Sequence, residues 1–205
     1  MLKNKLGIKS EIELAKEEER ISKLKAKKLF ENGFFDSLQC GTFASLATIH
    51  KELFIDIYEF AGEVRNVNIS KGNFRFAPTT YLKPALENIE KMPQSTFDEI
   101  VEKYVEMNVA HPFREGNGRS MRIWLDLILK NEIKKVVDWN SLDRDDYLFA
   151  MQRSPVKDTE IKLLIKTALT DDINNADVFM QGIDASYYYE GYTLYITKDL
   201  KEIKC

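Results

Sequence analysis

One stretch of the chain decides how the rest is arranged: His111-Pro112-Phe113-Arg114-Glu115-Gly116-Asn117-Gly118-Arg119-Ser120-Met121-Arg122. An amphipathic run from Phe97 to Ala110 precedes it, and an apolar run from Met121 to Leu129 follows it. The pattern predicts a loop between two helices, with Gly118 or Arg119 opening the second helix. Because the second helix is apolar around most of its circumference, we expect it to lie at the centre of the fold.

The start of this second helix is suited to binding phosphate. A helix N-terminus presents unpaired N–H groups and a partial positive charge, and glycine lets the backbone approach an anion closely. Arg119 and Arg122 are three residues apart, so both can point toward the loop. Taken alone, Gly116-Asn117-Gly118 is more often an ordinary turn, and His111, Glu115 and the arginines each have a structural alternative. For the stretch to be inert, all of these alternatives would have to hold together.

The twelve residues match the Fic-domain pattern His-x-Phe-x-(Asp/Glu)-Gly-Asn-(Gly/Lys)-Arg-x-x-Arg at every fixed position, so the chain resembles Fic-domain proteins. Proteins of this kind transfer the AMP moiety of ATP to a hydroxyl side chain of a target protein. The resemblance implies a mostly all-α fold, a Fic-type helical bundle with a small β-hairpin flap, and ATP and Mg²⁺ as cofactors. It covers roughly residues 58–191 of one domain, 1–205, in which residues 1–40 are an N-terminal helical extension.

The resemblance also implies roles for the first half of the motif, residues 111–122. His111 would be the general base that takes the proton of the attacking hydroxyl, and Glu115 would hold the Mg²⁺ that bridges the phosphates. Phe113 would anchor the loop in the core. The chemistry agrees, because histidine titrates near neutral pH and Mg²⁺ is often held by one carboxylate together with phosphate oxygens.

The second half of the motif would hold the nucleotide. By the same resemblance, the backbone of residues 116–118 and Asn117 would line the anion hole for the transferred α-phosphate, and Arg119 and Arg122 would bind the β- and γ-phosphates. Nucleotidyl transfer depends on in-line positioning and on neutralising negative charge, which such a cradle supplies. Fic relatives that act as kinases tend to carry Lys at the position of Gly118, so glycine favours AMP transfer.

Residues 58–77 carry a weak β-hairpin pattern, with alternating apolar residues on either side of Lys71-Gly72-Asn73. Fic proteins have a flap hairpin before the motif, which pairs with an extended target segment and places its hydroxyl. An exposed strand edge recruits peptides through main-chain hydrogen bonds, although a simple surface hairpin is the alternative. The residues predicted to dock the target are Ile69, Lys71, Gly72 and Phe74.

Residues 184–191 resemble the inhibitory helix of Fic proteins, (Ser/Thr)-x-x-x-Glu-(Gly/Asn). Ser186 and Glu190 are four residues apart, on one face of a short predicted helix that Gly191 would end. The resemblance implies that Glu190 pairs with Arg122 and occupies the place of the γ-phosphate; an ordinary C-terminal helix is the alternative. Three neighbouring hydroxyls suggest the hypothesis of automodification at Tyr187, Tyr188 or Tyr189.

The composition of the 205 residues suits a globular protein, with 44% hydrophobic and 31% charged residues. The net charge of −3 gives no basic excess that would favour direct nucleic-acid binding. No apolar run has the length of a membrane span or a signal peptide core, and Cys40 and Cys205 are interpreted as free thiols, so we expect a cytoplasmic protein. With two histidines and no HExxH spacing, His50 is expected to be structural.

Further helices are expected over residues 10–32, 42–54, 81–92, 141–152 and 158–169. The charged residues 23–28 of the first helix are interpreted as a solvated face. After the inhibitory helix, residues 193–197 are predicted to form a strand and residues 198–205 a mobile tail.

The sequence therefore predicts an autoinhibited protein adenylyltransferase. Its partners would be ATP and a protein with an acceptor Tyr, Thr or Ser, and a homo-oligomer is also open. The alternatives are the transfer of another phosphate-linked group, the removal of AMP from a modified protein, and a catalytically silent peptide-binding module. Intact His111, Glu115, Asn117 and both arginines argue against a silent module, because an adaptor has no need of this set.

Overall fold

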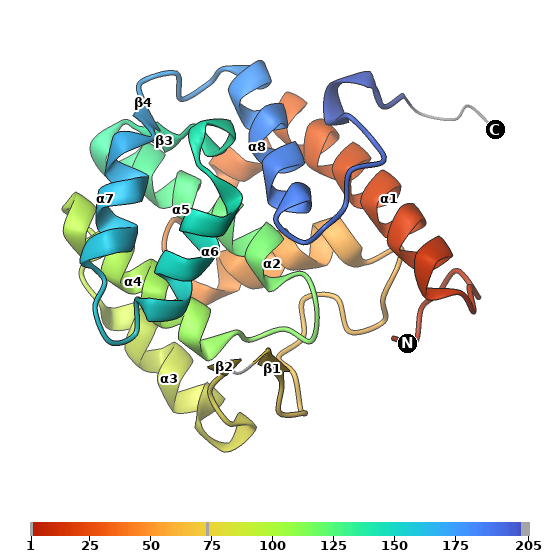
Figure 1. The fold of residues 1–205 in the computed structure, drawn as a ribbon, viewed down its shortest axis with the longest axis horizontal. Helices are drawn as coiled ribbons and strands as arrows, with labels where there is room; N and C mark the ends of the chain where they lie inside the picture. Colours follow the sequence, from red (N-terminus) through yellow and green to blue (C-terminus); the bar gives the residue numbers. More distant parts are fainter. Residues whose placement is uncertain (1, 73, 202–205) are drawn as a thin grey trace.

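The computed structural model describes residues 2–72 and 74–201. Asn73 of the predicted turn lies outside the described residues, as do residues 202–205 of the predicted tail, with Cys205. The described chain is mostly α-helical, with two short antiparallel strand pairs (Figure 1). The predicted fold class is therefore confirmed.

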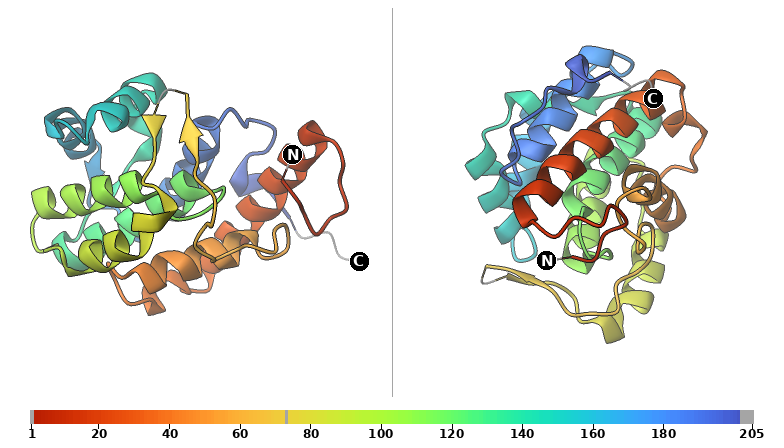
Figure 2. Two further views of the ribbon diagram at one scale, coloured as in Figure 1. Left: turned by 90° about the horizontal axis from the view of Figure 1, so that it is seen from below. Right: turned by 90° about the vertical axis from the view of Figure 1, so that its right-hand side faces the viewer.

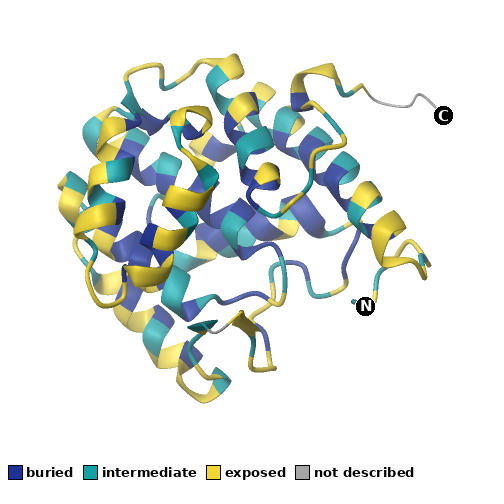
Figure 3. Cartoon of the chain, viewed as in Figure 1, coloured by how far each residue is buried: buried dark blue, intermediate teal, exposed yellow. Residues whose placement is uncertain are grey.

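Two helices on either side of the motif form the centre of the fold. α4 (Phe97–Ala110) begins with a capping box in which Thr96 and Glu99 bond each other's backbone N–H groups. α5 (Asn117–Ile133) follows the motif loop, and most of its residues are buried, as the colouring of Figure 3 shows. The motif therefore stands on two core helices, which make a rigid support.

The remaining helices pack around this pair. α1 and α2 are capped by Ser10 and Thr42, whose side chains accept from backbone N–H groups three residues later. The bounds of these elements are α1 Glu11–Glu31, α2 Phe43–Phe54, α3 Thr79–Lys91, α6 Arg144–Arg153, α7 Thr159–Thr167 and α8 Ala176–Tyr188. Three short 3₁₀ turns cover Phe35–Ser37, Trp139–Ser141 and Thr197–Asp199.

The strands are very short. β1 (Ser70–Lys71) pairs with β2 (Phe74–Arg75) in the flap, which is shorter than the predicted hairpin. β3 (Val136–Val137) pairs with β4 (Leu169–Thr170), and this second pair was not predicted. It joins the segment after α5 to the segment after α7, so it fixes how α6 and α7 cover one side of the core (Figure 1).

The interpretation of residues 23–28 of α1 as a solvated face is wrong for its first residue, Lys23. This lysine is 1% exposed, and its Nζ lies 2.9 Å from Glu19 Oε1 and 2.8 Å from Asp184 Oδ1. The reason is that α8 packs against α1, as Figures 1 and 2 show, and brings Asp184 to it. A charged helix face can be buried when a later element carries the opposite charge to it.

The C-terminal predictions need a similar correction. Residues 193–197 form no strand, and a 3₁₀ turn begins at Thr197. The segment follows α1: Glu19 accepts the N–H groups of Leu194 and Tyr195 at 3.2 Å, and Lys27 Nζ donates to Lys198 O at 2.8 Å. Backbone groups of this segment, which a strand would have paired with another strand, are thus bonded to charged side chains of α1.

Among the described helices, none combines the length and the apolar character that crossing a bilayer requires.

Candidate active site

His111 lies at the C-terminal end of α4 in a left-handed backbone conformation, with φ of 48°. Its backbone N–H still donates to Met107 O at 2.9 Å, and its ring stacks on Phe76 with ring centroids 3.6 Å apart. Ring atom Nδ1 lies 3.2 Å from Asn108 O. Because a carbonyl only accepts, Nδ1 carries the proton and Nε2 keeps a lone pair.

The surroundings of His111 keep the imidazole neutral. Burial lowers its pKa to about 3, while the hydrogen bond to Asn108 and the charge of Glu190 act in the opposite direction. The lowered pKa of His111 and the hydrogen bond at its Nδ1 both agree with the role of a proton acceptor, since a protonated ring would have no lone pair to offer.

Arg65 fastens this end of α4 to the base of the flap. Its guanidinium donates to His111 O at 2.8 Å, to Val67 O at 2.7 Å and to Ala77 O at 2.5 Å. Its own backbone N–H donates to Pro112 O at 2.8 Å. The sequence analysis did not single out Arg65, because it belongs to no motif and its acceptors are carbonyl groups brought together only by folding.

The motif loop is held from inside by Asn117. Its side-chain Oδ1 accepts from Phe113 N at 2.8 Å, and its Nδ2 donates to Phe113 O at 2.7 Å. Phe113 is fully buried, as predicted for the anchor of the loop, and stacks on His50 with centroids 3.9 Å apart. The side-chain amide of Asn117 is therefore bonded within the loop, and its backbone N–H is one of the first-turn donors of α5 that have no partner inside the helix.

His50 is structural, as predicted. Its Nδ1 accepts from Gly62 N at 2.8 Å and its Nε2 donates to Glu115 O at 2.8 Å. Burial lowers the pKa of His50 to about 4, so the ring remains neutral. It connects α2 to the motif loop and to the segment leading into the flap.

α5 begins at Asn117, one or two residues earlier than the predicted start at Gly118 or Arg119. Hydrogen bonding within the helix starts when Ser120 N donates to Gly116 O at 3.1 Å, which leaves the first N–H groups without a partner inside the helix. The residues that carry them line a cavity of about 610 Å³, which is within the usual range for a small-molecule site. The cavity is lined by His111, Glu115, Gly116, Asn117, Gly118, Arg119 and Arg122, by Ile69, Lys71, Gly72, Phe74 and Phe76, by Tyr147, Leu148 and Met151, and by Glu190.

Arg122 is occupied by the segment at the end of α8. Its Nε donates to Ser186 Oγ at 2.7 Å and its Nη2 to Ser186 O at 3.0 Å. Glu190 Oε1 lies 4.0 Å from Arg122 Nη2, whereas Glu190 Oε2 lies 2.7 Å from Lys71 Nζ of the flap. The structure thus places Glu190 near Arg122, as predicted. The shorter contacts are those of Ser186 with Arg122 and of Lys71 with Glu190. Together these two cations lower the pKa of Glu190, against the effect of its burial, so this carboxylate is charged.

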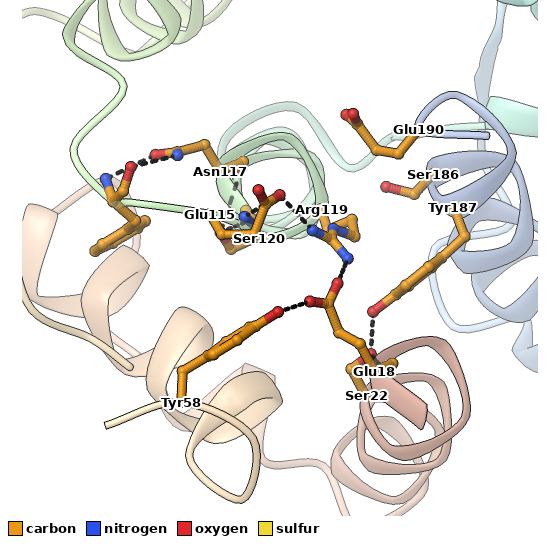
Figure 4. Close-up of polar contacts among 12 residues, drawn as sticks. Glu18, Ser22, Tyr58, Glu115, Asn117, Arg119, Ser120, Ser186, Tyr187 and Glu190 are labelled. Atoms are coloured by element: carbon orange, nitrogen blue, oxygen red, sulfur yellow. Dashed lines mark hydrogen bonds and ion pairs between the residues drawn. The ribbon is translucent and has the colours of Figure 1, made fainter. Parts of the chain in front are cut away.

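Arg119 is buried between two carboxylates (Figure 4). Its Nη2 donates to Glu115 Oε1 at 2.8 Å, and its Nη1 donates to Glu18 Oε1 of α1. Glu18 also accepts from the hydroxyl of Tyr58. Neither Glu18 nor Tyr58 was singled out from the sequence, because both lie outside the motif.

The predicted inhibitory helix is longer than expected and ends earlier. α8 starts at Ala176 and ends at Tyr188, so Glu190 lies in the turn that follows, and Gly191 has φ of 89°. The two hydroxyls of Tyr187 and Tyr189 point inward, toward Ser22 Oγ and Trp139 O, and both residues are 2% exposed. Only Tyr188, at 52%, is accessible for the hypothesised automodification in this conformation.

The residues present fit Mg²⁺ only with help from a bound nucleotide. The side chain of Glu115 is 41% exposed, and its Oε1 accepts from Arg119 and, at 3.0 Å, from Gly116 N. No described residue donates to its other oxygen, Oε2. Across residues 2–72 and 74–201 no three His, Cys, Asp or Glu side chains are grouped as a metal site. One carboxylate with phosphate oxygens and water is an arrangement that Mg²⁺ accepts.

Comparison with known proteins gives the family. Residues 42–129, from α2 through the motif and most of α5, match the model of the Fic/DOC family. The chain carries a domain of the Fic/DOC family. α1, with Glu18, and α8, with Ser186, lie outside the matched segment of this Fic domain.

Relatives and solved structures resemble the Fic domain and its flanks. The protein adenylyltransferase VbhT of Bartonella schoenbuchensis is 31% identical over 199 residues, 88% of this chain but 40% of that protein. The probable protein adenylyltransferase Fic of Escherichia coli is 25% identical over 138 residues, 62% of this chain and 68% of that one. The crystal structure of BepC from Bartonella tribocorum, with bound AMPPNP, has a TM-score of 0.67 at 20% identity and covers 83% of this chain and 92% of BepC. The last likeness supports the fold alone.

Proposed function

We propose that this chain is a protein adenylyltransferase that transfers AMP from Mg-ATP to a Tyr, Thr or Ser hydroxyl of another protein, and that its own C-terminal segment restrains it. The observation that carries the proposal is the pairing of a neutral imidazole with an anion-attracting helix start across one cavity. The names of the relatives, VbhT and Fic, point to the same activity.

The reaction needs little covalent chemistry from the protein. The target's hydroxyl oxygen attacks the α-phosphorus, the bond to the β-phosphate oxygen breaks, and pyrophosphate leaves. His111 takes the hydroxyl proton on Nε2, because its Nδ1–H is held by Asn108 O. The product is the AMP ester of the target side chain.

The charge that develops on the phosphates is stabilised by groups fixed before the reaction. The N–H groups of Asn117, Gly118 and Arg119 open α5, and Arg122 lies on the same side of the helix. Such preorganised donors act strongly because they need no rearrangement when charge develops. Glu115 would hold Mg²⁺ through Oε2, and the ion would supply further neutralisation of the triphosphate.

The position of Glu190 supports the proposed autoinhibition. A Cβ atom placed on Gly118 would lie 3.2 Å from both Arg122 Nη2 and Glu190 Oε1, so this carboxylate lies against the first turn of α5. Ser186 holds Arg122 at the same time. A carboxylate and a phosphate compete for the same guanidinium and the same helix start, so ATP would bind poorly or out of line.

The test compares the wild-type protein with Glu190→Gly, each incubated with labelled ATP and a cell extract. We expect Glu190→Gly to raise protein-bound AMP about tenfold or more, which corresponds to roughly 1.4 kcal/mol of removed competition. The matched control is Glu190→Gly with His111→Ala, which should lower transfer by about 10²- to 10⁴-fold and still bind ADP in calorimetry.

The outcomes separate the two parts of the proposal. An unchanged rate in Glu190→Gly, with His111-dependent transfer present, would refute the inhibitory role alone. If Glu190→Gly shows no AMP transfer and also does not bind ADP, the proposal that the chain is a transferase is refuted. Mass spectrometry of the labelled peptides would identify the target and its acceptor residue.

A further inference from the structure

Glu18 is a buried carboxylate on α1, the helix before the matched Fic segment, and it faces the motif. Its Oε1 accepts from Arg119 Nη1 and its Oε2 from the Tyr58 hydroxyl, so both oxygens are bonded (Figure 4). Glu18 and Arg119 are 101 residues apart in the chain. Removing a carboxylate from water is costly, so its partners have to be in place for it to be tolerated.

Arg119 is held from several directions. Its guanidinium carbon lies 5.1 Å from the ring centroids of both Phe54 and Tyr187 and 5.7 Å from that of Tyr192. Nη1 of the guanidinium forms an ion pair with Glu18 Oε1, and Nη2 forms one with Glu115 Oε1 at 2.8 Å. The guanidinium is therefore divided between two carboxylates, one from α1 and one from the motif loop.

This division sets the orientation of Glu115. Arg119 and the N–H of Gly116 both bond Oε1, so Oε2 of this partly exposed, cavity-lining side chain has no donor among the described residues. Without the charge of Glu18, the full attraction of Arg119 would act on Glu115. The planar fork of an arginine then tends to bond both oxygens of a carboxylate, which would remove the oxygen that a metal ion needs.

We propose, on the basis of the function proposed above, that Glu18 is a positioning residue for the metal-nucleotide complex: it holds Arg119 so that Glu115 keeps one oxygen free for Mg²⁺. α1 is then part of the active site and not only an N-terminal extension of it. The competing explanation is that the Glu18–Arg119 pair merely joins α1 to α5.

The two explanations differ in what happens to metal-free binding. If Glu18 only supports the fold, its loss weakens ADP binding equally with and without metal. If it positions Glu115, its loss lowers the gain in affinity that Mg²⁺ gives. Metal-free ADP should then bind as well as before or better, because one negative charge near the phosphates has gone.

The experiment measures the dissociation constant of ADP by calorimetry, with Mg²⁺ and with EDTA, in the 205-residue chain carrying Glu190→Gly. Adding Glu18→Gln should reduce the ratio of the metal-free to the metal-loaded constant by about 10- to 100-fold, the usual effect of losing a group that orients a metal ligand. The matched control is Glu19→Gln. Glu19 is the neighbouring buried carboxylate, bonded to Lys23 and the C-terminal segment, so this change should leave the ratio unaltered.

An unchanged ratio in Glu18→Gln, or equal weakening with and without metal, would overturn the inference while leaving the proposed function intact. Absence of ADP binding in the parent would overturn the proposed function, and this inference with it. If Glu18→Gln does not fold, Glu18→Asp decides: it keeps the charge but shortens the side chain, and the ratio should fall below that of the parent. A ratio equal to the parent's would then refute the positioning role.

Discussion

Gly116 is the residue at which the motif loop becomes α5. Its φ is 76°, and a Cβ atom built on it would lie 2.5 Å from the ring of Phe54. A side chain there would be strained by the backbone and would also push against a fully buried ring. The position of the helix start, and so of its N–H groups, depends on this one residue lacking a side chain.

We therefore expect Gly116→Ala to lower the free energy of unfolding by about 1–3 kcal/mol more than Gly33→Ala does. Gly33 is a matched control because it also has positive φ, 72°, but has open space around its Cβ position. Urea unfolding of the two variants measures the difference. Equal losses would show that the ring of Phe54 yields freely and that the close contact is unimportant.

The two histidines show how contacts assign different roles to the same side chain. His50 uses both ring nitrogens, one on Gly62 N and one on Glu115 O, so it can neither take nor give a proton without breaking a bond. His111 uses Nδ1 alone and lies at the cavity. The chemistry of a histidine depends on which nitrogen is left open.

At the scale of elements, α1 is the support on which the end of α8 rests. Lys23 bonds Glu19 of its own helix, Asp184 of α8 and the carbonyl of Tyr195 in the C-terminal segment. Figure 2 shows α1 and α8 running side by side. Because Glu190 lies just beyond α8, whatever fixes α8 also fixes the carboxylate at the nucleotide site.

We expect Lys23→Ala to destabilise the protein by about 3–5 kcal/mol, because it leaves the buried carboxylate of Glu19 and the partly buried one of Asp184 without this cation. Lys25→Ala is the control on the same helix. It removes a partly exposed pair with Asp56 and should cost less than about 1 kcal/mol. Chemical denaturation measures both. Similar costs for the two lysines would mean that Glu19 and Asp184 find water or other donors.

The flap is the second element that reaches the C-terminal segment. Lys71 of β1 bonds Glu190, while Phe76, just after β2, stacks on the catalytic-base candidate His111. The flap thus contacts both the group proposed to accept the proton and the group proposed to inhibit. Because Lys71 is largely exposed, its ion pair is weak and salt-sensitive.

At the scale of the whole molecule, stability should depend on pH through buried neutral histidine. The pKa of His50 is about 4 in the folded protein against an ordinary value of 6.5. Above pH 6.5 the ring is neutral in both states and the stabilisation is complete. As the pH falls toward 4, the unfolded chain binds a proton that the folded protein does not, so the free energy of unfolding decreases.

Comparing the unfolding free energy of the wild-type protein with that of His50→Gln cancels the contributions of the other titrating groups. The advantage of the wild-type protein over His50→Gln should shrink by about 2 kcal/mol between pH 7 and pH 5. Urea unfolding at the two pH values measures it. A constant difference would mean that His50 titrates normally in the folded state.

Residue types and their spacing account for the structural features that depend on near neighbours in the chain. The caps Ser10, Thr42 and Thr96 act on N–H groups three residues away, and the motif loop is closed by an Asn117–Phe113 contact four residues long. The apolar pattern after the motif placed α5 at the centre. Such features are local, so residue types and spacing are sufficient to predict them.

Which charged side chains form pairs depends on how distant elements pack together. Glu18 reaches Arg119 over 101 residues, Lys71 reaches Glu190 over 119, and Lys23 is buried because α8 brings Asp184 to it. A charged residue on a helix has the same local pattern whether water or a carboxylate faces it. Its burial depends on packing between elements far apart in the chain, so the partners of Arg119 and Glu190 could be found only in the folded molecule.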